Sequence, residues 1–485
     1  MDSQPPGSAI KETRLPPSPS RALMLGRRTG LHVVWSPDRS MMGRTFYLQP
    51  GHSLEIGRTK DVVKVPIADD FLSSRHVLLE CIHDSAGAQR WLVTDLKSTN
   101  GVFVNGRRCV KDKLIRGDVL RIGATLCVFD FVGERDVNED NMGMVGVSLA
   151  IADIRHQVRR IAKNDNNALI FGETGSGKEL IAQAMHDQSE RKGGPYVAIN
   201  CVSINENLIE SELFGYAAHA FSGASSKGHS GYFRRADGGT LFLDEIDKSS
   251  VRFQRVLLRV LQNRVVQPVG ATSDFPVNVR VVAAANRDLL TLIDNNEFQS
   301  DVYYRLNNAH LDAPSLRERR VDIPQLFEHF LSKKIPGGWR TILDRDWGSV
   351  WYISDLLEKL CCYNWPGNVR ELGNEAEKTA IAIDESLERG AMPLVPAPEI
   401  CLSRAVTSYR CVRADADQPD LDPERIVSYQ QKYSDPVLLQ EAIDSEAGGS
   451  IKKFAELSAP YLNKTWEGAR RQIYRVIGKR ADQDQ

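Results

Sequence analysis

The 485-residue sequence lacks the marks of a secreted protein, of a membrane protein and of a metal site built from cysteines. No apolar run approaches the roughly 20 residues that a membrane-spanning helix needs, and the N-terminal segment has no apolar signal core. Its eight cysteines form no C-x-x-C pair and no metal-ligand spacing, which is typical of scattered thiols in a reducing compartment. The net charge is −1, so binding to nucleic acid would need a local basic patch. We therefore expect a cytoplasmic protein that does not associate with membranes.

The chain is too long for a single hydrophobic core, so several domains are expected. Shifts in composition and periodicity indicate where the domains begin and end. The predicted segments are a Pro/Ser-rich disordered tail over 1–28, a β-rich module over 29–133, a hinge over 134–143, alternating strands and helices over 144–315, a helical unit over 316–389, a proline-rich linker over 390–430 and a helical C-terminal segment over 431–485.

The stretch ALIFGETGSGKEL at 168–180 organises the middle of the chain. It predicts a strand, a glycine-rich loop and an amphipathic helix that begins near Lys178. Such a loop directs backbone N–H groups at phosphates, the helix N-terminus adds partial positive charge, and Lys178 reaches the β- and γ-phosphates. A glycine turn before a helix can be purely structural, but the preceding strand favours ATP binding. The predicted ATP-binding residues of the loop are Gly172, Glu173, Thr174, Gly175, Ser176, Gly177, Lys178 and Glu179.

Two further apolar strands end in polar side chains. Asp244 and Glu245 follow one strand, and Asn286 follows another. Near-continuous apolar strands that alternate with helices predict a parallel sheet buried on both faces. Asp244 is expected to hold Mg²⁺, and Glu245 to polarise the attacking water. Asn286 is expected to hold the γ-phosphate or that water. Paired acids at a strand end are often only solvated, but beside a phosphate-binding loop they favour hydrolysis.

The module over 29–133 contains short β-like runs separated by turns, which predicts a sandwich of two sheets. Its loops carry the side chains of Arg58, Ser73, Thr99 and Asn100. A guanidinium, two hydroxyls and an amide suit a phosphate monoester and the peptide backbone beside it. The alternative is that the GR and NG pairs are hairpin turns only, which explains the glycines but not the clustered polar side chains.

This module resembles a forkhead-associated (FHA) domain. The resemblance depends on GR at 57–58, S-x-x-H at 73–76, D-x-x-S-x-N-G at 95–101 and VNG at 104–106. It implies that Arg58, Ser73, Thr99 and Asn100 bind a phosphothreonine-containing protein, with His76 bracing the loop. Where such domains often carry a basic or amide side chain, this sequence has a serine at position 74, which leaves the ligand preference open.

Residues 144–389 resemble the AAA+ central domain of bacterial enhancer-binding proteins, the sigma-54-dependent transcription activators. The stretches that carry the resemblance include GETGSGKE at 172–179, ESELFG at 210–215, GGTLFLDEID at 238–247, LRERRVDIP at 316–324 and NWPGNVREL at 364–372. The resemblance implies an α/β P-loop ATPase with a helical lid, ATP and Mg²⁺ as cofactors, sigma-54 RNA polymerase as partner and a homo-oligomer that forms a hexameric ring, as in the family.

The resemblance also assigns roles to single residues. Asn200 would restrain Glu245 until the ring is engaged. Arg305 would reach the ATP of the neighbouring subunit as an arginine finger, and Arg370 would act from the lid as a second sensor. The expected sigma-54 contact loop contains Phe221, Ser222 and Gly223.

The chain departs from this family at four positions. Ser222 stands where the family's GAFTGA loop has threonine, and it keeps a hydroxyl. His219 stands where the family's GAFTGA loop begins with glycine, and Gln299 replaces an arginine finger. Ala285 precedes Asn286 where the family often has threonine. These differences are compatible with a slower or more tightly controlled ATPase.

The C-terminal segment predicts three short helices with glycine and proline corners, which fit a helix-turn-helix unit. Residues 450–480 hold eight basic and two acidic side chains, a local net charge of +6 that suits promoter or enhancer DNA. The sequence thus predicts an ATP-driven, phosphothreonine-regulated transcription activator. The alternative is a phospho-dependent DNA-binding regulator or scaffold whose ring binds nucleotide without acting on sigma-54.

Overall fold

The computed structural model describes residues 28–47, 51–83, 89–132, 140–220, 225–391, 394–407 and 409. Nearly all of the predicted N-terminal tail, most of the predicted hinge and the predicted C-terminal helices lie outside the described residues. The chain divides into two units, residues 1–410 and 411–485, and all described residues belong to the first. No helix within these ranges is long and apolar enough to cross a bilayer.

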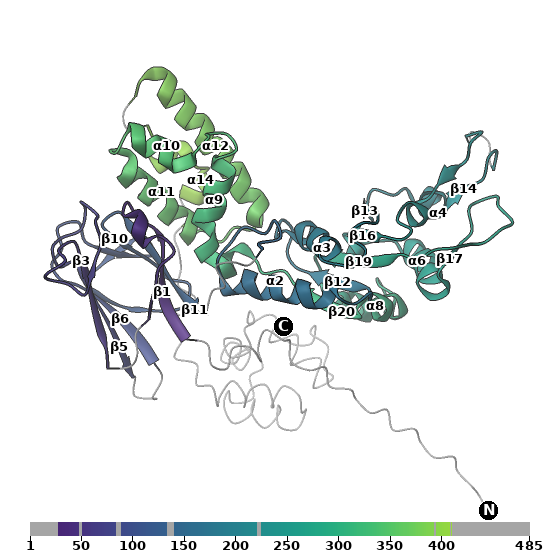
Figure 1. Cartoon of the computed structure of the whole chain (residues 1–485), viewed down its shortest axis with the longest axis horizontal. Helices are drawn as coiled ribbons and strands as arrows, with labels where there is room; N and C mark the ends of the chain where they lie inside the picture. The colour runs from purple at the N-terminus through teal and green to yellow at the C-terminus, as the bar shows by residue number, and fades with distance from the viewer. Residues whose placement is uncertain are drawn as a thin grey trace, which may run out of the picture. The chain divides into compact units, whose positions relative to one another are not determined.

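Residues 28–132 form a β-sandwich of two sheets (Figure 1), which confirms the predicted fold of this module. The strand orders are β2-β1-β11-β10-β7-β8 and β4-β3-β5-β6-β9. Burial alternates along β5, where Val77, Leu79 and Cys81 face the core, as expected for a strand with one buried face. The strands are β1 (Arg28–Trp35), β2 (Thr45–Tyr47), β3 (Ser53–Gly57), β4 (Val65–Pro66), β5 (Val77–His83), β6 (Gln89–Asp95), β7 (Val102–Val104), β8 (Arg107–Cys109), β9 (Lys111–Leu114), β10 (Val119–Ile122) and β11 (Thr125–Val132).

The next part of the chain builds a five-stranded parallel sheet in the order β13-β16-β19-β12-β20. Alternate residues of its strands enter two different cores: Leu241 lies in the core of one face and Phe242 in the core of the other. The sheet is therefore buried on both faces, as predicted. Its strands are β12 (Ala168–Phe171), β13 (Tyr196–Asn200), β16 (Thr240–Asp244), β19 (Arg280–Ala285) and β20 (Ala309–Asp312).

Helices flank this sheet, and short hairpins extend from it (Figure 1). Helix α6 begins after Ser250, whose side chain accepts the Phe253 N–H and so caps the helix. The helices are α2 (Leu149–Ala162), α3 (Lys178–Asp187), α4 (Ile209–Phe214), α5 (Tyr232–Arg235), α6 (Val251–Asn263), α7 (Leu289–Asp294) and α8 (Ser300–Leu306). The hairpins pair β14 (Gly215–Tyr216) with β15 (His229–Ser230) and β17 (Val265–Val266) with β18 (Phe275–Pro276).

A helical lid follows the sheet. It begins with the 3-10 segment η4 (Leu316–Asp322), in which Ser315 and Glu318 form a capping box. The helices that follow are α9 (Ile323–Leu331), α10 (Gly338–Arg345), α11 (Ser349–Cys362) and α12 (Asn368–Arg389). The pattern of apolar residues had predicted this helical unit.

The lid continues into the region expected to be a linker. Two short helices, α13 (Pro398–Cys401) and α14 (Arg404–Thr407), bury Val395, Cys401 and Val406. Their prolines suggested an unstructured segment, but apolar side chains between the prolines pack onto the lid. Thr379 of α12, for example, donates its hydroxyl to the Cys401 carbonyl oxygen. The segment 394–407 is thus part of the lid rather than a linker.

Candidate functional site

The glycine-rich loop between β12 and α3 has the geometry of a phosphate cradle. Gly175 and Gly177 have φ values of +78° and +102°, a region that favours glycine. Helix α3 begins at Lys178, and no side chain caps its N-terminus. Its first N–H groups are therefore available to an anionic ligand, and a Cβ at Gly177 would meet only open space. These features fit the phosphate groups of ATP.

Lys178 is held at the base of this loop. Its side-chain Nζ donates to the carbonyl oxygens of Gly172 and Glu173, at 2.9 and 3.0 Å, and to Asn286 Oδ1 at 2.5 Å. Burial lowers the pKa of Lys178, whereas the nearby carboxylate of Asp244 opposes that shift. Lys178 and Asn286, predicted from separate motifs, therefore meet in one hydrogen-bonded group.

The acidic pair lies where β16 ends. Asp244 Oδ1 accepts the Glu245 backbone N–H at 2.9 Å. Glu245 has φ +54°, a left-handed conformation that is uncommon outside glycine and often marks a functional position. Hydrogen bonds from Lys248 and Asn200 to its carboxylate lower the pKa of Glu245, and the Lys248 Nζ lies 3.0 Å from Glu245 Oε1. Glu245 is thus an anion held by an amide and an ammonium group.

Asn286 is positioned by Asp247, a residue that sequence analysis did not select. Buried Asp247 accepts the Asn286 backbone N–H at 3.0 Å and also binds the Arg287 guanidinium. The DEID stretch contains Asp247, but only the structure shows that it faces the next strand. Asp247 and Lys248 therefore support the side chains that were predicted to act on the nucleotide.

The lid closes one side of this site. The Val369 N–H donates to the Gly175 carbonyl oxygen at 3.0 Å, and a Cβ at Gly175 would lie 2.4 Å from the Gly367 carbonyl oxygen. Glycine is therefore needed for this close approach. The result is a cavity of about 280 Å³, which we call the nucleotide site. It is lined by Thr174, Gly175, Gly177, Lys178, Glu179, Leu180, Asp244, Glu245, Asn286, Phe330, Val369, Arg370 and Gly373.

Three predicted loop residues do not line the nucleotide site. Glu173 instead forms an ion pair with Arg317 of the lid, which lowers the pKa of the Glu173 carboxyl, and it also accepts from Asn368 at 3.0 Å. Ser176 is buried, and its carbonyl oxygen accepts from Arg319. Gly172 lies with Glu173 beside a second cavity.

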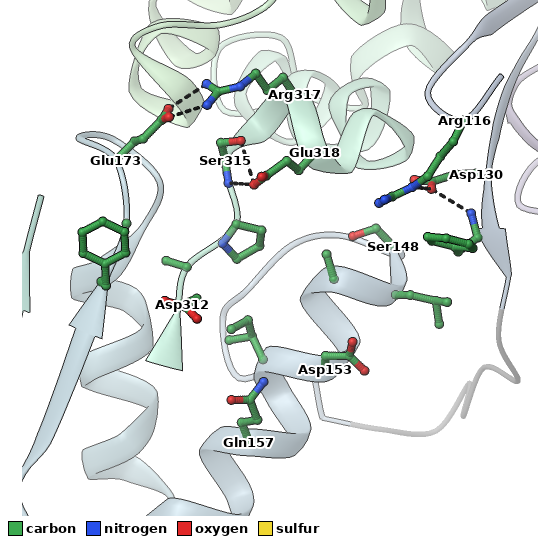
Figure 2. A pocket seen from close by; sticks show the side chains of 18 of the residues that line it. Arg116, Asp130, Ser148, Asp153, Gln157, Glu173, Asp312, Ser315, Arg317 and Glu318 are labelled. Carbon is green, nitrogen blue, oxygen red and sulfur yellow. Dashed lines mark hydrogen bonds and ion pairs between the residues drawn. The ribbon is translucent and has the colours of Figure 1, made fainter. Parts of the chain in front are cut away.

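This second cavity has a volume of about 410 Å³ and shares no lining residue with the nucleotide site (Figure 2). Figure 2 shows Glu173 and Arg317 on one side of it and Arg116, paired with Asp130 of the sandwich, on another. It is larger than the nucleotide site, but Lys178 and the acidic pair do not line it. The chemistry predicted for ATP therefore belongs to the smaller cavity.

Arg305, the predicted arginine finger, lies apart from the nucleotide site of its own chain. Arg305 lies on α8, is exposed and does not line that site. Phe221, Ser222 and Gly223 fall outside the described residues. Beside them, His219 has φ +59°, so histidine occupies a left-handed position that glycine would adopt without strain.

The predicted phosphothreonine-binding residues gather on loops of the sandwich. Ser73 Oγ accepts the Thr99 N–H at 3.0 Å, and Asn100 donates through Nδ2 to the Phe71 carbonyl oxygen at 2.7 Å. Arg58 and Thr99 are exposed, and the Arg58 N–H donates to the Ser73 carbonyl oxygen at 3.0 Å. We call Arg58, Ser73, Thr99 and Asn100 the phosphopeptide site.

Buried His76 connects two loops of this site through hydrogen bonds. It is buried, accepts the Ser73 N–H at Nδ1 (3.1 Å) and pairs through Nε2 with the Gly101 carbonyl oxygen (3.1 Å). An amide donor at one nitrogen and a carbonyl acceptor at the other require the neutral ring with its proton on Nε2. Burial lowers the pKa of His76, in agreement with this neutral form.

The parallel sheet, the glycine-rich loop, the acidic strand end and the lid define a P-loop ATPase of the AAA+ class. Comparison with known families gives a more specific assignment. Residues 144–312 match the sigma-54 interaction domain, residues 317–389 match the AAA+ ATPase lid domain and residues 54–123 match the FHA domain. The chain therefore carries an AAA+ ATPase domain of the sigma-54 interaction family together with an FHA domain.

Among curated proteins, the C4-dicarboxylate transport transcriptional regulatory protein DctD of Pseudomonas aeruginosa is 42% identical over 278 residues, 57% of this chain and 58% of that protein. The Nif-specific regulatory protein of Azotobacter vinelandii is 44% identical over 51% of this chain and 45% of that protein. The chain thus spans about half the length of these relatives. A crystal structure of NtrX from Brucella abortus in complex with ADP is 27% identical over 70% of this chain and 69% of that chain, with a TM-score of 0.46.

Proposed function

We propose that this protein is a transcription activator that hydrolyses ATP to remodel sigma-54 RNA polymerase and is regulated by a phosphothreonine-containing protein. The observation that carries the proposal is the convergence of Lys178, Asn286 and the Asp244–Glu245 pair on one cavity beside the phosphate cradle. Phosphoryl transfer depends mainly on positioning and on charge stabilisation, and this group supplies both.

Within the nucleotide site each residue has a separate task. Lys178 and the α3 N-terminus bind the phosphates, and Asp244 holds Mg²⁺, which typically takes one or two carboxylates and completes its shell with phosphate and water oxygens. Glu245 activates water, and its bond to Asn200 restrains that action until the ring engages its target. Arg370 responds to the nucleotide from the lid.

The active form is a homo-oligomer, a hexameric ring, in which Arg305 completes the site of the adjacent subunit. This arrangement is supported by the exposure of Arg305 on α8, away from the nucleotide site of its own chain. The loop that contains Phe221, Ser222 and Gly223 contacts sigma-54 and transmits to it the conformational change that ATP hydrolysis drives. The basic C-terminal segment binds promoter or enhancer DNA, and the protein works in the cytoplasm.

The second candidate is a phospho-dependent DNA-binding regulator or scaffold whose ring binds nucleotide without acting on sigma-54. The left-handed backbone of His219 favours it, since a histidine is strained in a conformation that the family's glycine adopts freely. In that case nucleotide binding would stabilise the assembled ring and would not drive remodelling of sigma-54 RNA polymerase.

In vitro transcription with sigma-54 RNA polymerase and ATP separates the two candidates. Glu245→Gln keeps the size of the side chain and removes its charge, so we expect ATP binding to persist while hydrolysis falls by about 10²-fold or more and transcription is lost. Glu190→Gln, an exposed position after α3, is the matched control and should transcribe as the wild type does. Transcription that survives Glu245→Gln would contradict the activator proposal and favour the scaffold.

A further inference from the structure

The FHA sandwich is docked on the lid through a buried ion pair. Arg121 of β10 donates through Nε to Glu358 Oε2 of α11 at 2.6 Å, and the two side chains are only 6% and 4% exposed. The other Glu358 oxygen accepts the Gly106 N–H at 3.0 Å. A buried carboxylate would be costly without such partners, so this contact depends on one specific docked geometry.

Further contacts extend the same surface. Ser354 of α11 accepts the Trp35 indole N–H at 3.0 Å and donates to the Ala124 carbonyl oxygen at 2.6 Å. The Trp351 ring lies 5.3 Å from the Phe71 ring and 4.9 Å from the Arg121 guanidinium. The docking surface therefore consists of α11 on the lid and, on the sandwich, of loops, strand β10 and the end of strand β1.

On the sandwich side, this surface continues into the phosphopeptide site. Phe71, which packs on Trp351, also accepts the Asn100 amide through its carbonyl oxygen. Buried Asp69 accepts the Phe71 N–H at 2.9 Å and the Ala124 N–H at 2.9 Å, so it joins the phosphopeptide loop to the turn that Ser354 contacts. Docking therefore fixes the carbonyl that orients Asn100, and a fixed loop binds a ligand at lower entropic cost.

On the lid side, the surface continues into the glycine-rich loop. Arg320 of η4 donates to the Gly117 carbonyl oxygen of the sandwich at 3.0 Å. Arg317 and Arg319, in the same short segment, contact Glu173 and the Ser176 carbonyl oxygen. One segment thus connects the sandwich with the loop that binds phosphates.

We propose that the surface between the FHA sandwich and α11 couples phosphothreonine recognition to nucleotide binding. In the docked state, Phe71 holds Asn100 in place, and the lid holds Arg370 over the nucleotide site. Each ligand therefore favours the docked state and tightens the binding of the other by the same factor. This inference rests on the proposed function, because it needs both ligands to bind.

The test measures binding of a fluorescent ADP analogue to the full chain, with and without a saturating decapeptide library that has a fixed central phosphothreonine. We expect the phosphorylated library to tighten ADP binding about fivefold or more, the low end of typical coupling, and the unphosphorylated library to have no effect. Trp351→Ala should abolish this factor. Trp351→Phe keeps a ring against Phe71 and should retain it. So should Trp347→Ala, an exposed lid position just before α11.

A wild-type chain that binds both ligands independently would overturn the inference, as would a Trp351→Ala chain that keeps the full coupling. If the wild type binds no phosphorylated library, the sensing part of the proposed function is wrong. The inference is then tested by whether disrupting the docking surface changes the affinity for ADP. Arg121→Glu should then weaken ADP binding at least threefold, and adding Glu358→Arg, which restores an opposite-charge pair, should recover it. Unchanged ADP affinity in Arg121→Glu would overturn the inference. Sigma-54 transcription enters neither measurement.

Discussion

The nucleotide site and the phosphopeptide site hold their cations in different ways. Lys178 is 7% exposed, lies at the base of its loop and has three oxygen partners within 3.0 Å. Arg58 is exposed on a loop of the sandwich, and its contact with the loop framework among the described residues is the hydrogen bond from its backbone N–H to the Ser73 carbonyl oxygen. In the nucleotide site, the fold holds the charged ammonium group of Lys178 itself. In the phosphopeptide site, the fold holds the backbone of Arg58, and the charged guanidinium extends from it into solvent.

This difference determines what a mutation removes. A buried cation shares its partners with the surrounding site, so its loss leaves several oxygens without a donor. An exposed cation is screened by solvent, so its loss removes the ligand contact and little else. The two sites should therefore respond unequally to the same type of substitution.

The largest effect is expected for Lys178→Ala. The variant removes a charge-assisted contact to the phosphates, which is worth up to about 3 kcal/mol, or about 100-fold in affinity. It also leaves Asn286 Oδ1 without its donor, which lowers the stability of the site. Titration with a fluorescent ATP analogue measures this change. Lys163→Ala, at the exposed end of α2, should bind as the wild type does. A loss below about tenfold would show that the buried position does not carry phosphate binding.

A smaller effect is expected for Arg58→Ala. Removing one exposed charge-assisted hydrogen bond costs about 1.5 kcal/mol, which corresponds to about tenfold weaker binding of a phosphothreonine peptide. Calorimetric titration with the phosphorylated library measures it, and the thermal stability of the sandwich should be unchanged. Arg90→Ala, on β6, provides a comparison on the same module. If Arg58→Ala bound the phosphorylated library as tightly as the wild type does, Arg58 would not belong to the phosphopeptide site.

The smallest effect concerns pH. It depends on His76, which supports the loops of the phosphopeptide site. Burial lowers the pKa of His76 in the folded sandwich, although the carboxylates of Asp95 and Asp69 oppose the shift. As the pH falls below about 6.5, the unfolded chain takes up a proton that the folded chain resists. The sandwich should therefore lose stability on acidification, by at most about 1.4 kcal/mol per pH unit, until the folded His76 titrates.

Hydrogen exchange of the β5 amides between pH 7 and 5.5, corrected for intrinsic rates, measures this loss. His76→Asn should lower stability at pH 7 but flatten its dependence on pH. His156→Asn, at an exposed position of α2, should keep the wild-type dependence. Equal slopes in all three proteins would show that His76 does not govern the acid response of the sandwich.

Local patterns in the sequence predicted the frameworks of both sites. The alternation of apolar residues gave the sandwich, and the GETGSGKE and LFLDE stretches gave the loop and strand end that meet around Lys178. These predictions succeeded because each motif fixes a local backbone shape, a glycine turn or an apolar strand, and places a functional side chain at a fixed distance along the chain from it. Parallel strands then bring their carboxyl ends to one edge without further information.

Contacts between distant segments could not be predicted in this way. Glu173 was expected to contact ATP, but Arg317, remote in sequence, pairs with it instead. Asp247 ends a recognised motif and Lys248 follows it directly, yet nothing in their spacing showed which group each would support. The pair of Arg121 and Glu358 joins residues 237 positions apart, and a single sequence carries no signal for such a pairing.

The arginines of η4 have one more consequence. Positions 317, 319 and 320 serve three different partners, and the backbone departs from helical geometry at Arg319 (φ −133°, ψ 50°), directly before Arg320, which contacts the sandwich. Because about three residues complete a turn of such a segment, inserting a single residue would rotate the guanidinium groups after it by about a third of a circle relative to those before it. The length of this short connector is therefore fixed by what it must reach, and insertions should be tolerated far less here than in the surface loops of the sandwich.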